Sequence, residues 1–470
     1  MEMITKNIPF FFNLRSITIA YLICYHYIKR NKKTFFISLF SSLILAFLLY
    51  KLDFLQPRQV LTQGFVGTYQ THDLPTEVAE LLSDGLVKSA EDGKIKANLV
   101  TGWETNSDAT VFKFRLKNNL KWVDNTDVLS TDLDFGIPNV EVKYPDEKIV
   151  EFHLKDSYSP FPSLLTKPIF KKGTLIGVGP YRLVGLEKSK IFITKLKLKS
   201  IERKFPELNI RFYPNEKTAL TGFKLGEIHA LFGINNSSVA DNPQIRIHQK
   251  TFFKELVTVL YNTNEQLLGI RSIRQALSFI SPKIDGMEVA NNPLAIKSWA
   301  YDKKSKKYLA NKEEAQEALQ RAKASAGEEV LKKELVLTTT PYLEDVGKKV
   351  VASWKDLGLN AKLRVESGIP QNFQALLITQ TIPDDPDQYF LWHSTQKKTN
   401  LSNYSSARVD KDLEDARKTS DDEKRKERYF DFQKALLEDA PATFLFYPKY
   451  NIFYLRKSEE KLMKVLPLQI

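Results

Sequence analysis

The sequence predicts an α/β fold whose two lobes hold mixed sheets. Three observations predict it: the length of 470 residues, the short strands that alternate with helices after residue 64, and a strand–helix–strand unit near residue 340. This length exceeds what one hydrophobic core usually serves, so two or three domains are expected. Hydrophobic residues make up 43% and charged residues 27% of the chain, which is a globular rather than a disordered composition.

The balance of residue types excludes several classes of protein. Lys and Arg number 69 against 56 Asp and Glu, a formal charge of +13. Residues 1–50 hold six bases and one acid, so the remaining chain carries 63 bases against 55 acids, or +8. That mild excess is no nucleic-acid footprint. The single cysteine, Cys24, excludes an internal disulfide and any multi-cysteine metal site.

Residues 34–50 predict a transmembrane helix. This run of 17 residues has no charge and is rich in Leu, Ile and Phe. As a helix it would rise roughly 25 Å, near the short limit for a bilayer core of about 30 Å. A basic block at residues 29–33 precedes it. By the positive-inside rule, residues 1–33 are expected in the cytoplasm and the main domain outside the cell membrane, as a single-pass protein.

We expect this anchor to stay uncleaved. Residues 50–54 lack the small residues that signal peptidase needs, and Cys24 precedes the apolar run, unlike a lipoprotein cysteine. A second apolar stretch, residues 16–28, fits the membrane interface better than a span, although both placements stay open. The alternative for residues 34–50 is a buried core helix.

After residue 64 the periodicity predicts strands and helices in turn. Residues 111–117 and 148–154 alternate with the period of two that a half-buried strand shows. Residues 334–339 and 360–365 are expected as strands around a helix at residues 342–357. The apolar side chains of that helix share one face, at Leu343, Val346, Val350, Val351, Trp354 and Leu357.

This strand–helix–strand unit implies a parallel pair with a right-handed crossover. Gly358 stands where the C-cap of its helix belongs. Residues 420–423, Ser-Asp-Asp-Glu, predict a capping box that opens a later helix. That helix is expected to end before Pro441 and to be followed by a strand at residues 443–447. Its buried side chains are expected to be Tyr429, Phe432 and Leu436.

No catalytic or metal motif can be assembled from the sequence. The six histidines are too far apart for an HExxH-type zinc site, and no GxSxG elbow or P-loop occurs. Residues 177–180, Gly-Val-Gly-Pro, resemble a dinucleotide loop, but a strand-like segment follows where a helix should begin. A tight turn that enters a strand is therefore expected there. We expect no enzyme activity, no cofactor and no metal.

Asp384, Asp385 and Asp387 form the densest group of carboxylates in the chain. One interpretation is Asp-Pro turn chemistry, with Asp387 capping a helix at residues 388–394. The other is a carboxylate that faces a ligand. Two tryptophans allow a similar choice between stacking on a ligand and packing in the core, namely Trp122 and Trp392.

Several segments, taken in order, resemble the family 5 extracellular solute-binding proteins of ABC importers, the oligopeptide- and dipeptide-binding class. They span about residues 64–447, and each is a weak motif that gains weight from the order. The segments are residues 82–88 with Asp92-Gly93, 103–108, 112–117, 120–124, 177–181, 260–263 with 274–277, 385–389, 392–394, 403–404, 409–410 and 438–441.

The resemblance implies a two-lobed periplasmic-binding-protein-like fold of the class C type, with a cleft that closes on an extended peptide. It implies a monomeric substrate-binding protein that delivers the peptide to ABC permease subunits. A membrane-anchored scaffold or chaperone that binds peptides without transport is the alternative. The expected domains are a cytoplasmic segment, a transmembrane helix, a first lobe, a second lobe and a return to the first lobe, at residues 1–33, 34–50, 51–255, 256–440 and 441–470.

The resemblance also implies which residues contact the ligand. They are the strand before Asp385-Pro-Asp387 with its neighbours, and four possible cleft walls. The set is Thr379, Gln380, Thr381, Ile382 and Asp384, with Trp122, Tyr181, Asn262 and Trp392 as the walls.

Three departures from the family pattern carry expectations of their own. Members that clamp a peptide amine have an aspartate where this chain has Ile382, so the clamp is absent unless Asp384 replaces it. The family has a partly helical segment of several dozen residues at this point in the chain, whereas this sequence has only residues 133–148. This shorter segment predicts a reduced sub-domain beside the cleft. The helix that contains Arg274 is expected to end early, at residues 280–282, Ile-Ser-Pro.

Overall fold

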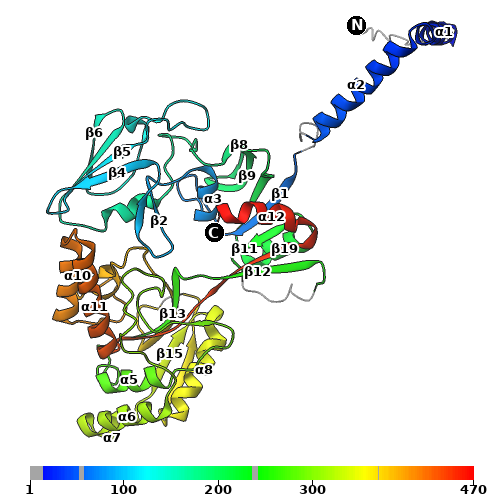
Figure 1. The fold of residues 1–470 in the computed structure, drawn as a ribbon. Coiled ribbons are helices and arrows are strands. Elements are labelled where there is room, and N and C mark those ends of the chain that lie inside the picture. The colour runs from blue at the N-terminus through cyan, green and yellow to red at the C-terminus, as the bar shows by residue number, and fades with distance from the viewer. Residues whose placement is uncertain (1–13, 52–57, 235–241, 369, 470) are drawn as a thin grey trace, which may run out of the picture. The chain divides into compact units, whose positions relative to one another are not determined.

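The computed structural model describes residues 14–51, 58–234, 242–368 and 370–469 of the chain. The chain divides into two compact units, Met1–Gln59 and Val60–Ile470. Figure 1 shows the helices and strands of both units, many of them labelled.

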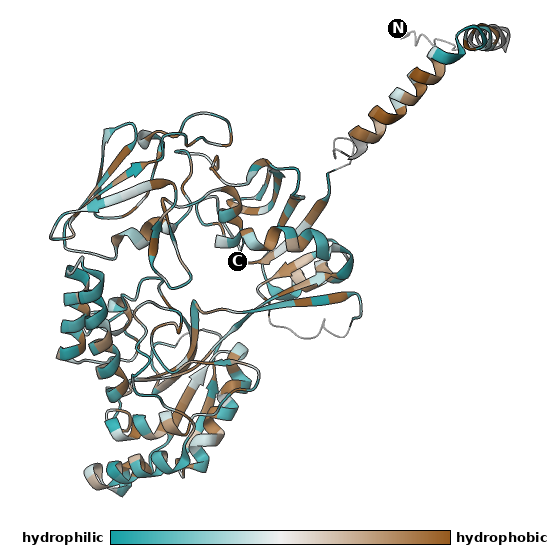
Figure 2. Cartoon of the chain, viewed as in Figure 1, coloured by the Kyte–Doolittle hydropathy of each residue, from teal (hydrophilic) through white to brown (hydrophobic). Residues whose placement is uncertain are grey.

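The first unit holds helices α1 (Leu14–Arg30) and α2 (Lys32–Lys51). Figure 2 shows that α2 is apolar along most of its length. In the part of the chain that the structure describes, no helix by itself has the length and apolar character of a membrane span. Tyr21–Arg30 and Lys32–Leu48 satisfy both conditions only together, as a pair bent by 102°. The single span expected at residues 34–50 is thus not supported, and residues 1–13 of the expected cytoplasmic segment lie outside the described residues.

The second unit contains a seven-stranded mixed sheet in the order β12-β19-β11-β1-β10-β9-β8. β1 pairs in parallel with β10 and β11, and the remaining pairs are antiparallel. We call the part built on this sheet the first lobe. Its strands are β1 (Val60–Val66), β8 (Tyr181–Ser189), β9 (Phe192–Ser200), β10 (Glu207–Tyr213), β11 (Ala230–Phe232), β12 (Ile245–Thr251) and β19 (Lys449–Leu455), and its helices are α3 (Thr76–Leu82), α4 (Glu216–Lys224) and α12 (Glu459–Val465).

A four-stranded antiparallel sheet, in the order β4-β5-β7-β6, forms a sub-domain within residues 86–178. The strands expected at residues 111–117 and 148–154 are confirmed as β5 and β7, because alternate side chains such as Phe112, Phe114 and Phe152 are buried. A short hairpin precedes this sheet. The strands are β2 (Val87–Ser89), β3 (Ile95–Ala97), β4 (Val100–Thr105), β5 (Val111–Leu116), β6 (Val140–Asp146) and β7 (Ile149–Leu154).

A six-stranded mixed sheet, in the order β14-β18-β13-β17-β15-β16, organises what we call the second lobe. β15 pairs in parallel with β16 and β17, whereas the other pairs are antiparallel. The strands are β13 (Glu255–Tyr261), β14 (Glu288–Val289), β15 (Leu335–Thr339), β16 (Ala361–Val365), β17 (Ala375–Thr381) and β18 (Ala442–Tyr447). The predicted mixed α/β class is confirmed.

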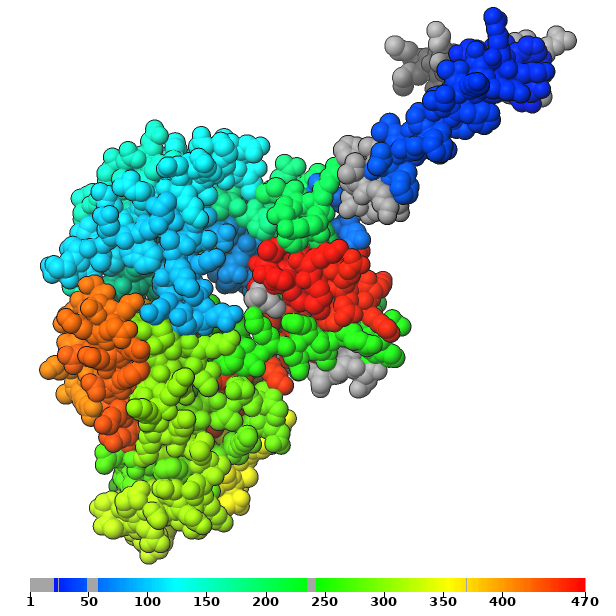
Figure 3. Space-filling model, in the orientation of Figure 1, coloured from blue at the N-terminus to red at the C-terminus, as the bar shows by residue number. Residues whose placement is uncertain are grey.

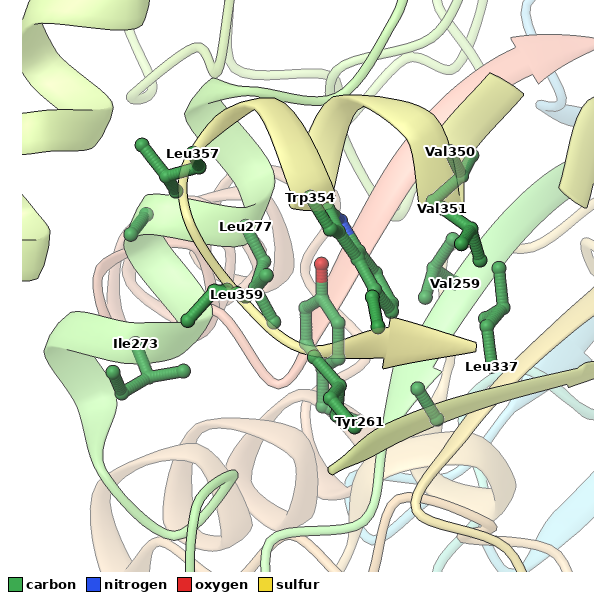
Figure 4. Packing of buried hydrophobic residues seen from close by; sticks show 14 of the residues in the cluster. Val259, Tyr261, Ile273, Leu277, Leu337, Val350, Val351, Trp354, Leu357 and Leu359 are labelled. Carbon is green, nitrogen blue, oxygen red and sulfur yellow. The ribbon is translucent and has the colours of Figure 1, made fainter. Parts of the chain in front are cut away.

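The predicted strand–helix–strand unit is confirmed as β15, α8 (Glu344–Asp356) and β16, with β15 and β16 parallel. Gly358 follows the helix with φ +93°, the left-handed region that a helix end favours for glycine. Figure 4 shows Trp354 of α8 packed above the sheet beside Tyr261, with ring centroids 6.4 Å apart. Leu337 lies fully buried in the same core. The spacing of apolar residues in the sequence therefore predicted the buried face of α8 correctly.

Further helices complete the second lobe. α5 (Arg271–Phe279) stops before Ile280, as expected. The predicted capping box is wrong by one residue: α11 begins after Asp421, whose carboxylate accepts hydrogen bonds from the backbone N–H groups of Glu423 and Lys424. Glu423 thus stands too early in the helix to complete the box. The helices are α5, α6 (Lys312–Ala326), α7 (Glu328–Leu331), α8, α9 (Tyr389–Trp392), α10 (Ala407–Lys418) and α11 (Asp422–Asp439).

Two short segments carry the chain between the large sheets. Phe252–Lys254 joins β12 to β13, and Pro448 joins β18 to β19. They run side by side, because the Phe252 N–H donates to the Pro448 carbonyl at 2.8 Å. The strands on either side belong to different sheets. We call these two segments the hinge, since a change of lobe angle must pass through them.

Candidate functional site

The last residues of β17 form an open strand edge beside the hinge. β15 pairs with β17 only from Leu337–Ala375 to Thr339–Leu377. β13 continues to pair with the other side of β17 as far as Glu255–Thr381. Among the described residues, no strand therefore pairs with the β15 side of β17 beyond Leu377. Unpaired backbone at a sheet edge is a template for another extended chain.

The register shows which backbone groups face this edge. The Ile382 N–H donates to the Lys254 carbonyl at 2.8 Å, so that pair is hydrogen-bonded across the ladder. In an antiparallel pair, hydrogen-bonded and non-hydrogen-bonded positions alternate. The N–H and C=O groups of Thr379 and Thr381 therefore point away from β13, toward the open edge. The Thr379 hydroxyl is also buried without a hydrogen-bond partner among the described residues.

Asp384 follows this edge and is paired with the hinge. Its carboxylate lies 3.1 Å from the Lys254 ammonium, and both side chains reach solvent. Ile382, which stands where relatives with an amine clamp have an aspartate, is buried at 5% exposure in the second-lobe core. The structure thus puts an apolar side chain at that position and a neutralised carboxylate two residues later.

Asp385 and Asp387 are buried, and each is paired with an arginine. Arg425 Nη2 lies 2.8 and 2.9 Å from the two oxygens of Asp385. Arg417 contacts Asp387 at 2.8 to 3.1 Å. The same carboxylates accept backbone N–H groups two residues ahead, including that of Tyr389 at the start of α9. The turn interpretation therefore holds, but the predicted cap is wrong: Gln388, and not Asp387, occupies the N-cap position of α9, and the helix ends at Trp392, short of the predicted limit.

The turn between β2 and β3 joins the sub-domain to the second lobe. The Trp299 N–H donates to the Asp92 carbonyl at 2.7 Å. Gly93 has φ +79°, and a Cβ there would lie 2.6 Å from the Asp384 carbonyl oxygen. Only glycine fits both the conformation and the contact. A second junction lies nearby, where the Ser159 N–H donates to the Arg417 carbonyl at 2.7 Å.

A pocket of about 170 Å³ opens along this junction, and we call it the seam pocket. Its walls come from both the sub-domain and the second lobe. The lining residues are Gly93, Lys94, Ile95, Trp103, Thr105, Ala109, Phe112, Ser159, Pro160, Pro162, Ser163, Trp299, Asp385, Ser420, Asp422 and Arg425.

On the first-lobe side, Glu80 of α3 faces the hinge. Loss of hydration raises its pKa to about 7; Lys254 opposes the rise, and Glu77, Asp84 and Asp384 add to it. The Glu80 side chain still reaches solvent. Charges from α3, the hinge and the open edge therefore act on one another across a shared space. Figure 3 shows an opening between blue to light-blue residues, the red C-terminal residues and green residues.

The predicted contact residues fall into two groups. Thr379, Gln380 and Thr381 lie at the open edge, with Gln380 half-buried and Thr381 exposed. The three predicted aromatic walls are each no more than 1% exposed and donate to protein acceptors: Trp122 to Asp132, Tyr181 to the Pro206 carbonyl, and Trp392 to Gln388.

Asn262, the fourth predicted wall, clamps neighbouring loops. Its amide nitrogen donates to the Phe373 carbonyl at 3.0 Å, and its oxygen accepts from Asn403. The structure adds residues that were not among the predicted contacts, because each depends on a distant partner: Glu80, Gly93, Lys254, Trp299 and Arg425. Only Gly93 had a local signal, the Asp-Gly turn.

The described residues include no group of three or more His, Cys, Asp or Glu side chains arranged to hold a metal ion. Asp384, Asp385 and Asp387 are instead paired with Lys or Arg. The arrangement offers an open strand edge, a pocket with three aromatic lining residues, and a hinge.

Comparison with known proteins gives a consistent result. Residues 133–402 match the model of the bacterial extracellular solute-binding proteins, family 5, middle region. The oligopeptide-binding protein AppA of Bacillus subtilis (strain 168) is 25% identical over 83% of this chain and 84% of its own length. The probable D,D-dipeptide-binding periplasmic protein DdpA of Escherichia coli (strain K12) is 22% identical over 76% of this chain and 80% of its own.

Solved structures share the fold. NikZ from Campylobacter jejuni, in complex with Ni(L-His), has a TM-score of 0.66 and 22% identity, covering 85% of this chain and 94% of NikZ. AppA from Bacillus subtilis, in complex with a nonapeptide, has a TM-score of 0.62 and 21% identity, covering 87% of this chain and 99% of AppA. The two-lobed α/β fold of this chain is therefore the fold of these binding proteins.

Proposed function

Because this chain belongs to the family 5 bacterial extracellular solute-binding proteins, the binding proteins of ABC importers, we propose that it captures extended peptides between its lobes. The observation that carries the proposal is the open edge of β17 after Leu377. A strand edge pairs with any peptide backbone, whatever its side chains, and so suits a protein that collects varied peptides.

In this proposal a peptide pairs with the N–H and C=O groups of Thr379 and Thr381. Gln380 and the unpartnered Thr379 hydroxyl supply further polar contacts. Ile382, Trp122, Tyr181, Asn262 and Trp392 then act by shaping the cleft, which agrees with their packed positions. The names of AppA and DdpA refer to peptides, whereas NikZ holds a nickel chelate. The strand edge favours a peptide over a chelate.

Asp384 is the proposed partner of a peptide amino terminus. It is the partly exposed carboxylate next to the open edge, and its present partner is Lys254 at 3.1 Å. A peptide amine has to displace this ammonium or share the carboxylate with it. Replacing the Lys254 ammonium by the peptide amine costs little free energy, because exposed ion pairs contribute only about 0–1 kcal/mol. Amine recognition is thus proposed as weak and reversible.

We further propose that residues 34–50 anchor the protein in the cell membrane, with permease subunits as its partners there. Support comes from the uncharged run and from the bent helix pair that meets the length and hydropathy of a span. Alkaline extraction of membranes tests this anchor. The full chain is expected to stay with the lipid, and its release into the soluble fraction would contradict the anchor.

The proposed lobe limits are residues 51–255 and 256–440, with residues 441–470 returning to the first lobe. β19, in the seven-stranded sheet, supports the return to the first lobe. β18 (Ala442–Tyr447) still belongs to the six-stranded sheet of the second lobe, so the return begins at Pro448 and not at residue 441. A reduced sub-domain is proposed as well, because the structure has only β6 and turns between Leu133 and Lys148. A smaller sub-domain leaves more of the cleft open to a ligand.

Native mass spectrometry of the full-length protein, released from detergent, tests peptide capture. Bound peptides of varied mass should co-purify and should be recovered intact after denaturation. A protein that carries no peptide and binds none from an added tripeptide library would refute the proposal. Cleaved peptides would instead indicate an enzyme. Uptake of labelled peptide into cells with and without the gene then separates transport from a scaffold role.

A further inference from the structure

The hairpin of β8 and β9 concentrates positive charge. Residues 181–200 hold six bases and one acid, Glu187, whereas residues 60–470 as a whole hold 61 bases and 54 acids. Five of the seven excess positive charges in residues 60–470 therefore lie in this hairpin. β8 is an edge strand of the seven-stranded sheet, and β9 is its neighbour (Figure 1). The hairpin thus forms a cationic margin of the first lobe.

Four of these bases share the outer face of the hairpin. Lys195, Lys197 and Lys199 of β9 alternate with leucines that are buried in the first-lobe core. Lys199 pairs across the strands with Arg182 of β8, and cross-strand partners lie on the same face. Glu187 lies 3.4 Å from the Lys195 ammonium and 3.9 Å from that of Lys197. One carboxylate against four bases leaves this face of the hairpin at +3.

The turn of the hairpin exposes apolar side chains. Ile191 is 60% exposed and Phe192 is 37% exposed. Two exposed bases, Lys188 and Lys190, precede them in the turn. Apolar side chains that remain in water add little to the stability of the fold, because the gain comes from the area that is buried. Ile191 and Phe192 are therefore available to a partner.

Protection of a sheet edge explains only part of this pattern. Lysines on an edge strand prevent pairing between molecules, which would account for Lys188. Exposed apolar residues have the opposite effect, and β9 has a partner strand on each side, so its lysines guard no edge. The combination suits an anionic lipid surface instead. Ammonium groups meet the lipid phosphates there, while apolar side chains enter the boundary with the acyl chains.

The chain itself keeps the hairpin close to the proposed anchor. Only residues 52–59 separate α2 from β1, and so short a segment spans at most about 30 Å. β1 belongs to the same sheet as the hairpin and is separated from β9 by β10 alone. Two strand spacings add about 10 Å. A bilayer that holds α2 is therefore within reach of the hairpin.

From these observations we propose that the β8–β9 hairpin docks on the bilayer and binds anionic lipid headgroups; this rests on the proposed anchor at residues 34–50. Lys195, Lys197 and Lys199 contact the phosphates, and Ile191 and Phe192 enter the apolar boundary. The first lobe is thereby held against the membrane. The second lobe is joined to it through the hinge and stays free to close on a peptide.

Nitroxide labelling of the full-length protein in lipid nanodiscs tests the proposal. Cys24→Ser removes the native thiol, and Ile191→Cys provides one labelling site at the turn. The discs contain phosphatidylcholine alone or equal parts of phosphatidylcholine and phosphatidylglycerol. In the anionic discs the label should be accessible to oxygen, which dissolves in lipid, and protected from a water-soluble nickel chelate. In the neutral discs it should stay accessible to the chelate. A label at Leu309→Cys, 59% exposed in the second lobe, should stay accessible to the chelate in both.

The matched variant combines Lys195→Gln, Lys197→Gln and Lys199→Gln. Each lysine near an anionic surface strengthens binding about fivefold, so this variant should return the label at residue 191 to water. The control changes three exposed lysines of the second lobe to Gln and should leave the label in lipid, namely Lys303, Lys304 and Lys307. If the β9 variant fails to fold, high salt applied to the unchanged hairpin should release the label in the same way.

The possible failures can be told apart. A label at residue 191 that stays in water in the anionic discs, while the protein remains in the discs, would overturn this proposal and leave the anchor intact. Lipid contact that persists in the β9 variant or in high salt would overturn it too, because positive charge would then not hold the hairpin. If the full-length protein does not remain in the discs, the proposed anchor fails, and this proposal fails with it.

Discussion

Strand β17 has two halves with different surroundings. From Ala375 to Leu377 it is paired on both sides and lies under the core that contains Trp354 and Leu337. From Thr379 to Thr381 it keeps one partner strand and ends beside charged side chains. In the first half, both edges of the strand are hydrogen-bonded to neighbouring strands of the sheet. The second half leaves backbone groups without a partner strand among the described residues, which stabilises nothing in the free protein but offers a place for a ligand.

The difference shows how a binding site can be made from an ordinary sheet. No unusual residue is needed at Thr379 or Thr381; what matters is that β15 stops at Thr339 while β17 continues. The part of β17 that serves folding therefore ends at Leu377, and the part proposed for binding begins two residues later, at Thr379. Changes in the two halves should affect different measurements, and the following tests use that separation.

The largest effect is expected in the doubly paired half. Leu337→Ala removes a fully buried side chain from the core next to Trp354. Such a cavity costs about 2–5 kcal/mol of unfolding free energy. Urea denaturation should show this loss, and peptide affinity at low temperature should stay unchanged. Leu309→Ala, at a side chain 59% exposed, is the control and should be nearly neutral. A matching loss of affinity in Leu337→Ala would show that the two halves are not separate.

The next largest effect is expected at the open edge. Thr379→Pro removes an N–H that faces the ligand and leaves the ladder with β13 intact, since Thr379 does not donate to β13. A peptide carbonyl left without its donor costs about 1–3 kcal/mol, or about 5- to 150-fold in affinity. Thr379→Val keeps the N–H and removes only the hydroxyl, so it separates backbone from side chain. Equal affinities for the Pro and Val variants would contradict pairing at this edge.

Sequence patterns predicted two elements around the doubly paired half, β15 and α8, whereas β17 itself was expected only from the family resemblance. The apolar spacing in residues 342–357 identified the buried face of α8 because that spacing reflects burial directly. The same holds for β5 and β7. Where the signal was a single residue, the limits shifted: Asp421 rather than Ser420 caps α11, since both side chains can accept the N–H and only the backbone geometry decides.

The open half could be located but not explained from the sequence. The family resemblance pointed to Thr379, Gln380 and Thr381, whereas the end of pairing at Leu377 is a property of the register with β15. The pair of Asp385 with Arg425 joins residues 40 positions apart, so no local pattern predicts it. Both features are tertiary, and both decide what the site can bind.

A smaller effect is expected from the charge beside the edge. Asp384→Asn should weaken the binding of peptides with a free amino terminus by no more than about 5-fold and leave amino-acetylated peptides unchanged, because an exposed ion pair contributes at most about 1 kcal/mol. Calorimetry with both peptide types measures the difference. Lys254→Met, which frees Asp384 from its 3.1 Å partner, should strengthen the free-amine peptides. Equal changes for both peptide types would assign Asp384 to the hinge alone.

The smallest effect concerns pH. The pKa of Glu80, raised to about 7 by loss of hydration, exceeds its usual value of 4.5, so the folded protein holds this proton more tightly than the unfolded chain. Its contribution to stability is full below pH 4.5 and is lost as the pH rises through 7. Glu80→Gln should therefore lose less thermal stability between pH 5 and 8 than the wild type. Glu104→Gln, on exposed β4, is the control and should match the wild-type profile.

Amide hydrogen exchange at single-residue resolution tests the central claim most directly. In the free protein, the Thr379 and Thr381 amides should exchange faster than that of Leu377, because among the strands that the structure describes only β15 lies on that side, and its pairing ends at Leu377. Addition of a peptide in excess should slow the exchange of both threonine amides, and Leu377 should hardly change. Protection of Thr379 and Thr381 by the peptide is the result we predict. Exchange at both residues that stays the same while the peptide is bound would contradict pairing at the open edge.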